Sequence, residues 1–364
     1  MGSVMTDKQT PRPSLLSLAT SVPPYRLKQS DVANFCADLF QESFADFERL
    51  MPIYGNAAID SRYSCVPLDW YAEPHGFKEC NALYVENALN LLEDAAGRAL
   101  AQAGLGHEDV DAVISVSSTG IATPSLDALI VERMNLRRDV ERLPVFGLGC
   151  AGGVIGLARA GQMAISRPGT RVLFLVVELC GLTFRSNDSS KSNVIATALF
   201  GDGAAAAVLT AETPETTARA GTPVLSAWGE HTWAGTLDVM GWNVEDDGFG
   251  VLFSRDIPGI VRRDYGAALD RFLAANGLAL DDIDGFAVHP GGAKVVDALE
   301  EVFGLDPGEL ACTRAVLRDF GNMSAATVLF VLERILAGAE PSGRILISSL
   351  GPGFTAAFSV LEPA

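Results

Sequence analysis

The chain has 364 residues and a formal net charge of −18, from 27 basic and 45 acidic side chains. This acidity argues against a surface for nucleic acid or for an anionic membrane. A hydrophobic content of 48% is typical of an ordinary globular core and excludes a disordered or fibrous protein.

Residues 1–14 are polar and interrupted by prolines, so they lack the apolar core of a signal peptide. The longest apolar stretch, 172–184, contains Glu178 and is too short to span a bilayer. We therefore expect a cytoplasmic protein without a membrane span. The six cysteines are scattered, which predicts reduced thiols. None of the four histidines has metal-ligand spacing with a cysteine, which predicts no metal site.

The predicted elements of the first half of the chain recur in the second half. Residues 98–120 read as a helix, a glycine stop, a turn and an apolar strand, and residues 271–292 repeat this order at a shift of 173 residues. The shift superposes Asp111 on Asp284. Because glycines and aspartates share this register, the similarity exceeds that of any two unrelated helix–strand pairs.

The elements that follow also correspond between the two copies. Each copy continues with a helix of small residues, an apolar strand and a glycine-rich strand. Helices that alternate with apolar strands predict mostly parallel sheets covered by helices. We predict two α/β halves, residues 1–210 with the nucleophile and residues 211–364. The segments 30–80 and 211–255 have no counterpart, and we expect them to cap the entrance to the site.

Three polar side chains are candidates for chemistry. Cys150 lies at the first turn of a predicted helix, where the helix N-terminus favours the thiolate and makes a nucleophile. His289 ends an apolar strand before a Pro-Gly-Gly turn, where α/β sheets bind ligands. The repeat pairs Cys150 with Asn322, so we expect all three in one crevice. Taken singly, they have structural alternatives: an inert buried cysteine, a structural histidine and a helix N-cap.

The glycines before the same predicted helix permit another interpretation. Gly147-x-Gly149-x-x-Gly152 has the form of a dinucleotide fingerprint between strand and helix, and Glu178 closes the following strand. The signal is weak, because the second copy has no such glycines and because a nucleotide site leaves His289 unexplained. A dinucleotide-binding oxidoreductase and a non-catalytic binding protein are the alternatives from other functional classes.

Five segments carry a resemblance to a known family: GLGCAGG, ALFGDGAAA, AVHPGG, GNMSAAT and GPGFTAAFSVLE. Through them the chain resembles the type III polyketide synthases, which are chalcone synthase-like enzymes. It resembles in particular the bacterial alkylpyrone and alkylresorcinol synthases. The resemblance runs from about Pro13 to the C-terminus. It implies a thiolase-like five-layer αβαβα fold built from two similar halves, and a homodimer. Ketoacyl synthase III enzymes, which stop after one condensation, share the Cys-His-Asn set and are the nearest alternative. The Pro-Gly-Gly after His289 and the Phe200 before GDGAAA favour the polyketide branch.

The resemblance implies a role for each residue of this acyltransferase. Cys150 takes an acyl starter from coenzyme A, with His289 holding the thiolate as an ion pair. His289 and Asn322 stabilise the enolate that forms when malonyl-CoA loses CO₂. Phe200 separates the entrance tunnel from the cavity. Iterative extension and cyclisation complete the product, and coenzyme A thioesters are substrates, with no permanently bound cofactor.

Two positions depart from the plant members of this family. Val251 stands where they have a gatekeeping phenylalanine, and Trp242 stands where they have a glycine. We expect this exchange to open a narrow apolar channel for a fatty acyl starter, which gives an alkylpyrone or alkylresorcinol-type product. The loop around Thr123 is a candidate to reach the partner subunit's cavity. The other positions that match the family's cavity are Ser118, Thr119, Thr123, Cys180, Thr183 and Ser324.

The basic residues that the family uses for coenzyme A are sparse here. The matching stretch, FERLMPIYG, keeps only Arg49, and Lys294 is the candidate for a second positive charge. An acidic protein needs local positive potential to bind an anionic substrate. An acyl-carrier protein is therefore left open as the donor of the starter. The starter, the number of extensions and the mode of ring closure are not predicted by the sequence.

Overall fold

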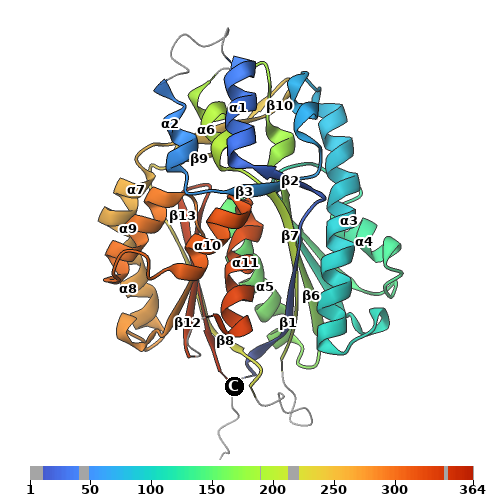
Figure 1. Ribbon diagram of the computed structural model, residues 1–364. Helices are drawn as coiled ribbons and strands as arrows, with labels where there is room; N and C mark the ends of the chain where they lie inside the picture. The colour runs from blue at the N-terminus through green and yellow to red at the C-terminus, as the bar shows by residue number, and fades with distance from the viewer. Residues whose placement is uncertain (1–10, 41–48, 189, 212–220, 340–342, 364) are drawn as a thin grey trace, which may run out of the picture.

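The computed structural model describes residues 11–40, 49–188, 190–211, 221–339 and 343–363. The repeat is confirmed: two similar sets of strands and helices pack against each other (Figure 1). The first set consists of β1 (Pro13–Ser21), α3 (Phe77–Ala103), β4 (Ala112–Val116), α4 (Leu126–Arg133), β5 (Glu141–Val145), α5 (Gly152–Ser166), β6 (Arg171–Leu179), α6 (Lys191–Leu199) and β7 (Asp202–Ala211).

The second set begins after β7 and repeats the order of the first with some changes. It consists of β8 (Val224–Thr232), α7 (Ile257–Ile260), α8 (Gly266–Ala275), β11 (Gly285–Val288), α9 (Ala293–Phe303), α10 (Ala311–Phe320), α11 (Thr327–Arg334), β12 (Ile345–Gly351) and β13 (Thr355–Glu362). Helix α10 stands where the first set has the edge strand β5, so the two sets are similar but not identical.

The remaining elements lie together at one end of the molecule, the upper end in Figure 1. They include two antiparallel strand pairs, in which β2 pairs with β3 and β9 pairs with β10. The 12-residue helix α1 follows β2 directly. These elements are β2 (Tyr25–Lys28), α1 (Gln29–Phe40), α2 (Pro52–Asn56), β3 (Ser61–Ser64), η2 (Leu68–Ala72), β9 (Met240–Glu245) and β10 (Gly248–Phe253).

The aspartates of the repeat make the same contact in both halves. The Asp111 carboxylate accepts the backbone N–H of Arg171 at 2.8 Å, before β4 and at the start of β6. The Asp284 carboxylate accepts the N–H of Arg344 at 2.8 Å, before β11 and β12. Each aspartate therefore joins the beginnings of two neighbouring parallel strands, which explains why the repeat keeps this residue.

The three largest apolar clusters of the described residues separate five layers. One cluster lies between the two halves, around α5 and α11, and includes side chains from the inner faces of the strands of both halves. A second lies between α3 and the outer face of the first set of strands. The third lies between α8, α9 and the second set. The order is therefore helix, sheet, helix, sheet, helix, as expected.

The expectation of mostly parallel sheets is wrong. The nine main strands form one mixed sheet in the order β11-β12-β13-β8-β1-β7-β6-β4-β5, and its two halves, which meet at the Ser14–Val224 pair of β1 and β8, are the two sheet layers. Only β4–β5, β4–β6 and β11–β12 are parallel pairs. A turn at residues 352–354 joins β12 to β13, and so short a connection permits only antiparallel pairing. The alternation of helices and strands did not reveal this turn.

A second correction concerns the segment 211–255. It was expected to cap the entrance as a whole, but residues 224–232 form β8 in the middle of the sheet, paired with β13 and, at Val224, with β1. This strand is the counterpart of β1. Only β9 and β10, later in the segment, lie with the elements at the upper end.

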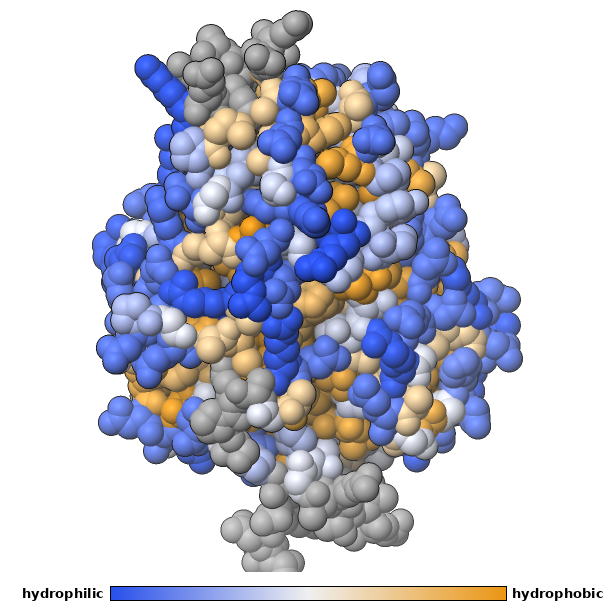
Figure 2. Space-filling view, viewed as in Figure 1, coloured by the Kyte–Doolittle hydropathy of each residue, from blue (hydrophilic) through white to orange (hydrophobic). Residues whose placement is uncertain are grey.

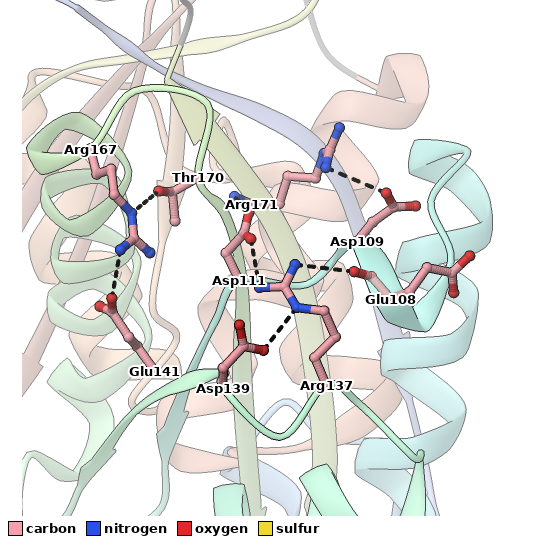
Figure 3. Close-up of polar contacts among 9 residues, drawn as sticks. All are labelled: Glu108, Asp109, Asp111, Arg137, Asp139, Glu141, Arg167, Thr170 and Arg171. Atoms are coloured by element: carbon pink, nitrogen blue, oxygen red, sulfur yellow. Dashed lines mark hydrogen bonds and ion pairs between the residues drawn. The ribbon is translucent and has the colours of Figure 1, made fainter.

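Opposite the candidate site, the amino ends of β4, β5 and β6 carry a network of ion pairs, which Figure 3 shows. Arg137 contacts Asp111 and Asp139, both at 3.0 Å, and Arg167 contacts Glu141 at 2.8 Å. Since these side chains are in contact with solvent, each pair contributes little to the stability of the fold. The network aligns strand ends and has no role in the site. None of the helices in the described ranges is long and apolar enough to cross a bilayer.

Candidate active site

Cys150 lies in a tight turn, η4 (Gly149–Ala151), directly before α5. The Ser118 hydroxyl accepts the backbone N–H groups of Gly147 at 3.2 Å and Gly149 at 3.1 Å, which fixes this turn against the end of β4. Gly149 has a φ of +46°, and a Cβ there would lie 2.6 Å from Pro352. The turn therefore requires glycine for its backbone shape and for close packing.

Close packing also explains Gly152 of the dinucleotide fingerprint and the neighbouring Gly153, whereas Gly147 is explained by its φ of +90°. A Cβ at Gly152 would lie 2.6 Å from the Val116 side chain, and one at Gly153 would lie 2.3 Å from the Ala325 carbonyl oxygen. These glycines let α5 approach β4 and the second half of the chain. They are accounted for without a bound nucleotide.

Asn322 lies opposite Cys150, as the repeat predicts, and its backbone is tied to the end of α6. Its N–H donates to the Leu199 carbonyl at 2.8 Å, and its own carbonyl accepts the N–H of Gly201 at 3.0 Å. Its Oδ1 accepts the N–H of Ser324 at 2.8 Å, but the N-cap residue of η8 (Ser324–Ala326) is Met323, so Asn322 is not a helix N-cap. Its Nδ2 donates to the Gly291 carbonyl at a longer 3.3 Å.

His289 directly follows β11 and is 4% exposed. Its backbone N–H donates to the Ser348 carbonyl at 2.8 Å, but neither ring nitrogen has a hydrogen-bond partner in the described structure. Burial lowers the pKa of the imidazole to about 3, so the ring is neutral. His289, Cys150 and Asn322 line one cavity of about 420 Å³, together with apolar side chains such as Met240 and Phe253 from β9 and β10.

The Cys150 thiol is also neutral in this arrangement. Its Sγ lies 3.6 Å from the Ser324 hydroxyl. Burial raises the pKa of the thiol to about 12, with a further increase from the charge of Glu178, while hydrogen bonds from Ser324 and Asn322 lower it. The ion pair that the resemblance implies is absent from the structure as described, because burial disfavours both charges.

Glu178 is the site residue whose role the sequence did not indicate. It is fully buried at the end of β6. Its Oε2 accepts the Ser118 N–H at 3.0 Å and the Thr119 hydroxyl at 2.9 Å, and its Oε1 accepts the Ser324 hydroxyl at 3.4 Å. Burial raises the pKa of this carboxyl to about 7. The available signal was one acidic residue inside an otherwise apolar strand.

Phe200, Trp242 and Val251 lie together beside Asn322. Phe200 follows α6, forms a backbone bridge to Asn322 and has its ring centroid 6.3 Å from that of Trp242, edge to face. The Trp242 indole N–H donates to the Ser118 carbonyl at 2.8 Å. Val251 is the direct cross-strand neighbour of Trp242 in the β9–β10 pair. The two positions that depart from plant enzymes are therefore in contact range of each other.

A second cavity, of about 590 Å³, is lined by Cys180, Thr183, Phe200 and Val251 and extends to α1. Thr119 and Thr183 also line a third cavity, of about 330 Å³, beside β10. Thr123 is exposed on the loop before α4, so the structure does not bring it to these cavities of the described chain.

Arg49 and Lys294 are both exposed. Ala293, beside Lys294, belongs to the same apolar cluster as Ala57 and Ile59, which follow α2. Since Arg49 lies shortly before α2, the two basic residues belong to one side of the molecule. This placement follows from the positions of Ala293 and α2 in the fold and does not depend on the contacts of the two basic side chains.

The comparisons agree with this geometry. The family model for the N-terminal domain of chalcone and stilbene synthases matches residues 5–213, and the model for the C-terminal domain matches residues 231–361. A protein of Bacillus subtilis named putative chalcone synthase is 39% identical over 94% of this chain and 96% of its own length. The 1,3,6,8-tetrahydroxynaphthalene synthase of Streptomyces peucetius is 39% identical over 96% of this chain and 93% of its own.

Among solved structures, PKS-I of the brown alga Ectocarpus siliculosus superposes with a TM-score of 0.90 at 28% identity, covering 98% of this chain and 100% of its own. Both family models together cover most of the chain, and the relatives match over nearly their whole length. The chain therefore belongs to the chalcone and stilbene synthase family and is a type III polyketide synthase of thiolase-like fold, an acyltransferase-type condensing enzyme.

Proposed function

We propose that this enzyme loads an acyl starter onto Cys150 and extends it with malonyl-CoA. The observation that carries the proposal is one cavity lined by Cys150, His289 and Asn322, in which both imidazole nitrogens are buried without a partner. A buried polar group without a hydrogen bond costs free energy, so such groups are retained where a substrate supplies the partner.

Loading uses the neutral imidazole as a base. As the Cys150 sulfur attacks the thioester carbonyl of the starter, its proton passes to a ring nitrogen of His289. A carbon–sulfur bond forms to Cys150, the bond to coenzyme A breaks, and the proton returns to the departing thiolate of coenzyme A. The lowered pKa of His289 favours this return of the proton.

Extension uses His289 and Asn322 as hydrogen-bond donors. Malonyl-CoA loses CO₂, and the electron pair of the broken carbon–carbon bond forms an enolate whose oxygen accepts from the imidazole N–H and the Nδ2–H of Asn322. The long 3.3 Å contact of Nδ2 with Gly291 leaves this donor easy to redirect. The enolate carbon attacks the thioester carbon, the bond to the Cys150 sulfur breaks, and the extended chain is now a thioester of coenzyme A. The Cys150 thiolate then attacks this thioester, coenzyme A leaves and takes up a proton, and the reloaded Cys150 enters the next cycle.

The starter is a fatty acyl group, and the product is an alkylpyrone or alkylresorcinol-type compound. Val251 lines the apolar second cavity beside Phe200, so a side chain smaller than phenylalanine leaves this cavity open. Trp242 contacts Ser118 and the Phe200 ring and closes the space on its own side. Phe200 separates the two cavities and excludes water from the decarboxylation.

The product masses formed from malonyl-CoA with acyl-CoA starters of increasing length test this proposal. We expect multiply extended, cyclised products with long-chain starters. Exclusive use of aromatic starters would refute the fatty acyl assignment. A single condensation would indicate a ketoacyl synthase III type reaction, and a product from malonyl-CoA alone would refute the need for an acyl-CoA starter.

Arg49 and Lys294 are the candidates to bind the phosphates of coenzyme A, and their exposure on one side of the molecule supports this. The acyl donor is tested by comparing loading of Cys150 from acyl-CoA and from an acyl-carrier protein. Replacement of both basic residues by glutamine raises KM for acyl-CoA if they bind the phosphates. Unchanged KM in this double variant rules the assignment out.

The enzyme is a homodimer that pairs through the edge of the sheet at β5. This strand has one neighbour, β4, and the apolar side chains of Ile121, Leu143 and Phe146 beside it are 48%, 37% and 57% exposed. An exposed edge strand with apolar residues favours pairing with a second copy. Light scattering tests this: Phe146→Glu is expected to give monomers, whereas Leu237→Glu, at a residue 79% exposed elsewhere, leaves the dimer intact.

A further inference from the structure

The wall of the catalytic cavity contains a buried hydroxyl group that the mechanism does not use. Ser349 of β12 is 4% exposed and lines this cavity together with Cys150 and His289. We propose that Ser349 is a positioning residue: its hydroxyl and the Nδ1 atom of His289 hold one water molecule between them, which orients the imidazole toward Cys150. This inference rests on the proposed role of His289 and adds to it the group that holds the other side of the ring.

The first argument is the hydrogen bonding of two neighbouring serines in β12. The Ser348 and Tyr265 hydroxyls bond each other at 2.6 Å. Within the described part of the chain, the Ser349 hydroxyl has no partner, and neither ring nitrogen of His289 has one. Buried polar groups without a protein partner are typically bonded to a buried water molecule. Two such groups in one cavity therefore indicate a shared water.

The second argument is the register of β11 and β12. These parallel strands pair Val288 directly with Ser348. The His289 N–H continues the pairing, because it donates to the Ser348 carbonyl at 2.8 Å. Since successive side chains of a strand alternate between its two faces, His289 and Ser349 lie side by side on one face, and Val288 and Ser348 lie on the other.

The face that His289 and Ser349 share is directed toward the nucleophile. Gly351 comes two residues after Ser349 and therefore lies on the same face. A Cβ at Gly351 would lie 2.6 Å from the Ala151 side chain, next to Cys150 in the chain. Neighbouring strands lie about 4.8 Å apart. This separation is too wide for a direct hydrogen bond between the two side chains and suits one bridging water.

The third argument is the orientation of the imidazole. A Cβ at Gly291 would lie 3.8 Å from the Cδ2 atom and 3.9 Å from the Nε2 atom of His289. The Gly291 carbonyl accepts the Asn322 amide, so the Nε2 edge of the ring faces the Asn322 side of the cavity. The Nδ1 atom is on the opposite edge of the ring, and it needs a partner other than the substrate.

His289 and Ser349 are shielded from bulk solvent, since each is 4% exposed. Helix α9 packs on the outer face of β11 and β12, and α10 contacts β11 (Figure 1). The surface on this side of the molecule carries many hydrophilic side chains (Figure 2), but neither residue belongs to it. A water molecule between them is therefore enclosed by the protein and has a fixed position.

A hydroxyl group and a water molecule suit both tasks of His289. In loading, Nε2 accepts the proton of Cys150 while Nδ1 carries a proton and donates it in a hydrogen bond. In extension, Nε2 donates to the enolate while Nδ1 accepts. Because water and hydroxyl groups both donate and accept, one contact serves both tautomers. The change of tautomer moves one proton from Nδ1 to Nε2, with water as its carrier.

Alkylation of Cys150 by iodoacetamide, measured by mass spectrometry over a range of pH, tests the assignment without any substrate. Ser349→Ala removes the hydroxyl, and Ser349→Thr keeps it. In Ser349→Ala, the rate at pH 7 should fall about tenfold and the midpoint of the pH profile should rise by about one unit. Ser349→Thr should stay within about twofold of the wild-type rate.

Ser359→Ala is the matched control and should leave the profile unchanged. The Ser359 hydroxyl of β13 is also buried without a partner in the described part of the chain, but it does not line the cavity. Ser349→Ala should keep the wild-type melting temperature, because the hydroxyl that it removes has no protein partner. A lower melting temperature in Ser349→Ala would indicate a structural role instead.

The pH profile reports on His289, because an imidazolium forms when the ring takes the thiol proton. Its Nδ1–H needs an acceptor, so without one the proton stays on the sulfur to a higher pH. The titratable residues that line the cavity are Cys150, His289 and Tyr265, and Glu178 acts on Cys150 from β6. Burial raises the pKa of Tyr265. Tyr265 and Glu178 are the same in all variants, so neither accounts for a difference between them.

The assignment is wrong if Ser349→Ala leaves the alkylation profile unaltered, if Ser359→Ala changes it equally, or if Ser349→Thr does not restore it. It is also wrong if a crystal structure of the wild type shows no water within about 3.2 Å of both the Ser349 Oγ and the His289 Nδ1.

A failure of the proposed function gives a different result. If Cys150 takes no acyl group from acyl-CoA but the alkylation profile shifts in Ser349→Ala, the function is wrong and the assignment of Ser349 stands. If the acyl adduct forms and the profile does not shift, the assignment is wrong and the function stands.

Discussion

The two neighbouring cavities of this enzyme differ in the hydrogen bonding of the polar groups that line them. Around Cys150, the imidazole of His289 has no partner on either nitrogen, and the Asn322 Nδ2 donates to the Gly291 carbonyl at a long 3.3 Å. In the cavity under α1, the hydroxyls of Ser64 and Tyr71 and the amides and hydroxyls near them are bonded within the protein. One cavity has unused donors and acceptors, and the other has none among these groups.

The difference indicates that the two cavities have different functions, one in the reaction and the other in recognising the starter. Buried polar groups without partners are costly, so a fold retains them where a reaction supplies the partner. Paired polar groups and apolar walls recognise a ligand by shape and length instead. Replacements in the first cavity should therefore affect every starter equally. Replacements in the second should change which starters are used and leave the chemistry intact.

The strongest test of this difference in function is Cys150→Ala. Removing the nucleophile should lower condensation at least about 10³-fold for short and long starters alike. Mass spectrometry of the intact protein should show the acyl adduct on the wild type and none on the variant. Cys312→Ala, at a buried cysteine of α10, is the control and should keep the adduct. An adduct on Cys150→Ala would contradict the assignment.

Asn322→Ala removes one donor to the enolate and leaves the thiol in place. We expect decarboxylation of malonyl-CoA to fall about 10²–10³-fold, as for other donors to a developing oxyanion, while loading of the starter continues. Release of CO₂ and the acyl adduct are measured separately. Asn276→Ala, at the end of α8 where the amide donates to the Phe272 carbonyl, should change neither. Equal losses in loading and decarboxylation would argue against the role.

Val251→Phe narrows the apolar cavity beside Phe200 and should change the relative activity with short and long starters. The ratio of kcat/KM for dodecanoyl-CoA to that for acetyl-CoA should fall about tenfold, because fewer methylenes are buried. Leu252→Phe is the control, since consecutive strand residues point to opposite faces. If both variants lower kcat/KM to the same extent for the two starters, Val251 does not shape the cavity that recognises the starter.

Two further variants move the pKa of the nucleophile in opposite directions. Ser324→Ala removes a hydrogen bond that lowers the pKa of Cys150, so the pKa should rise and alkylation by iodoacetamide should slow by about tenfold. Glu178→Gln removes a charge that raises this pKa, so alkylation should quicken.

The effect of Glu178→Gln should also depend on pH. The carboxyl has a pKa of about 7, so it is ionised above pH 7 and neutral below it. The variant should therefore exceed the wild type in alkylation rate above pH 7 and match it at about pH 5. If Ser324→Ala and Glu178→Gln changed the alkylation rate in the same direction, the electrostatic account of the Cys150 thiol would be wrong.

Much of the candidate site followed from local patterns in the chain. The glycines around Cys150, the Pro-Gly-Gly after His289 and the shift that pairs Cys150 with Asn322 are visible in the sequence because each reflects a backbone requirement or a duplicated unit. The repeat also predicted two similar halves, whereas the five-layer arrangement was implied by the family resemblance. The direction of β7 and β13 did not follow from the sequence, because the pairing of strands depends on connections that hydrophobic periodicity does not encode.

The contacts of Glu178 and Arg62 were decided by the tertiary structure. Nothing near Glu178 in the chain shows that its carboxylate will meet Ser118 and Ser324, since those residues are distant in sequence and only folding brings them together. Likewise, Arg62 is an ordinary basic residue until burial places it against the carbonyls that end α6.

The sequence by itself determined which residues are candidates for catalysis, the repeat and the apolar or polar character of each segment, because these depend on residues close together in the chain. Only the tertiary structure decided that Cys150 and His289 are both uncharged and that a second, apolar cavity ends at α1. Burial, and with it the pKa of a thiol or the length of a cavity, is a property of all the surrounding side chains at once.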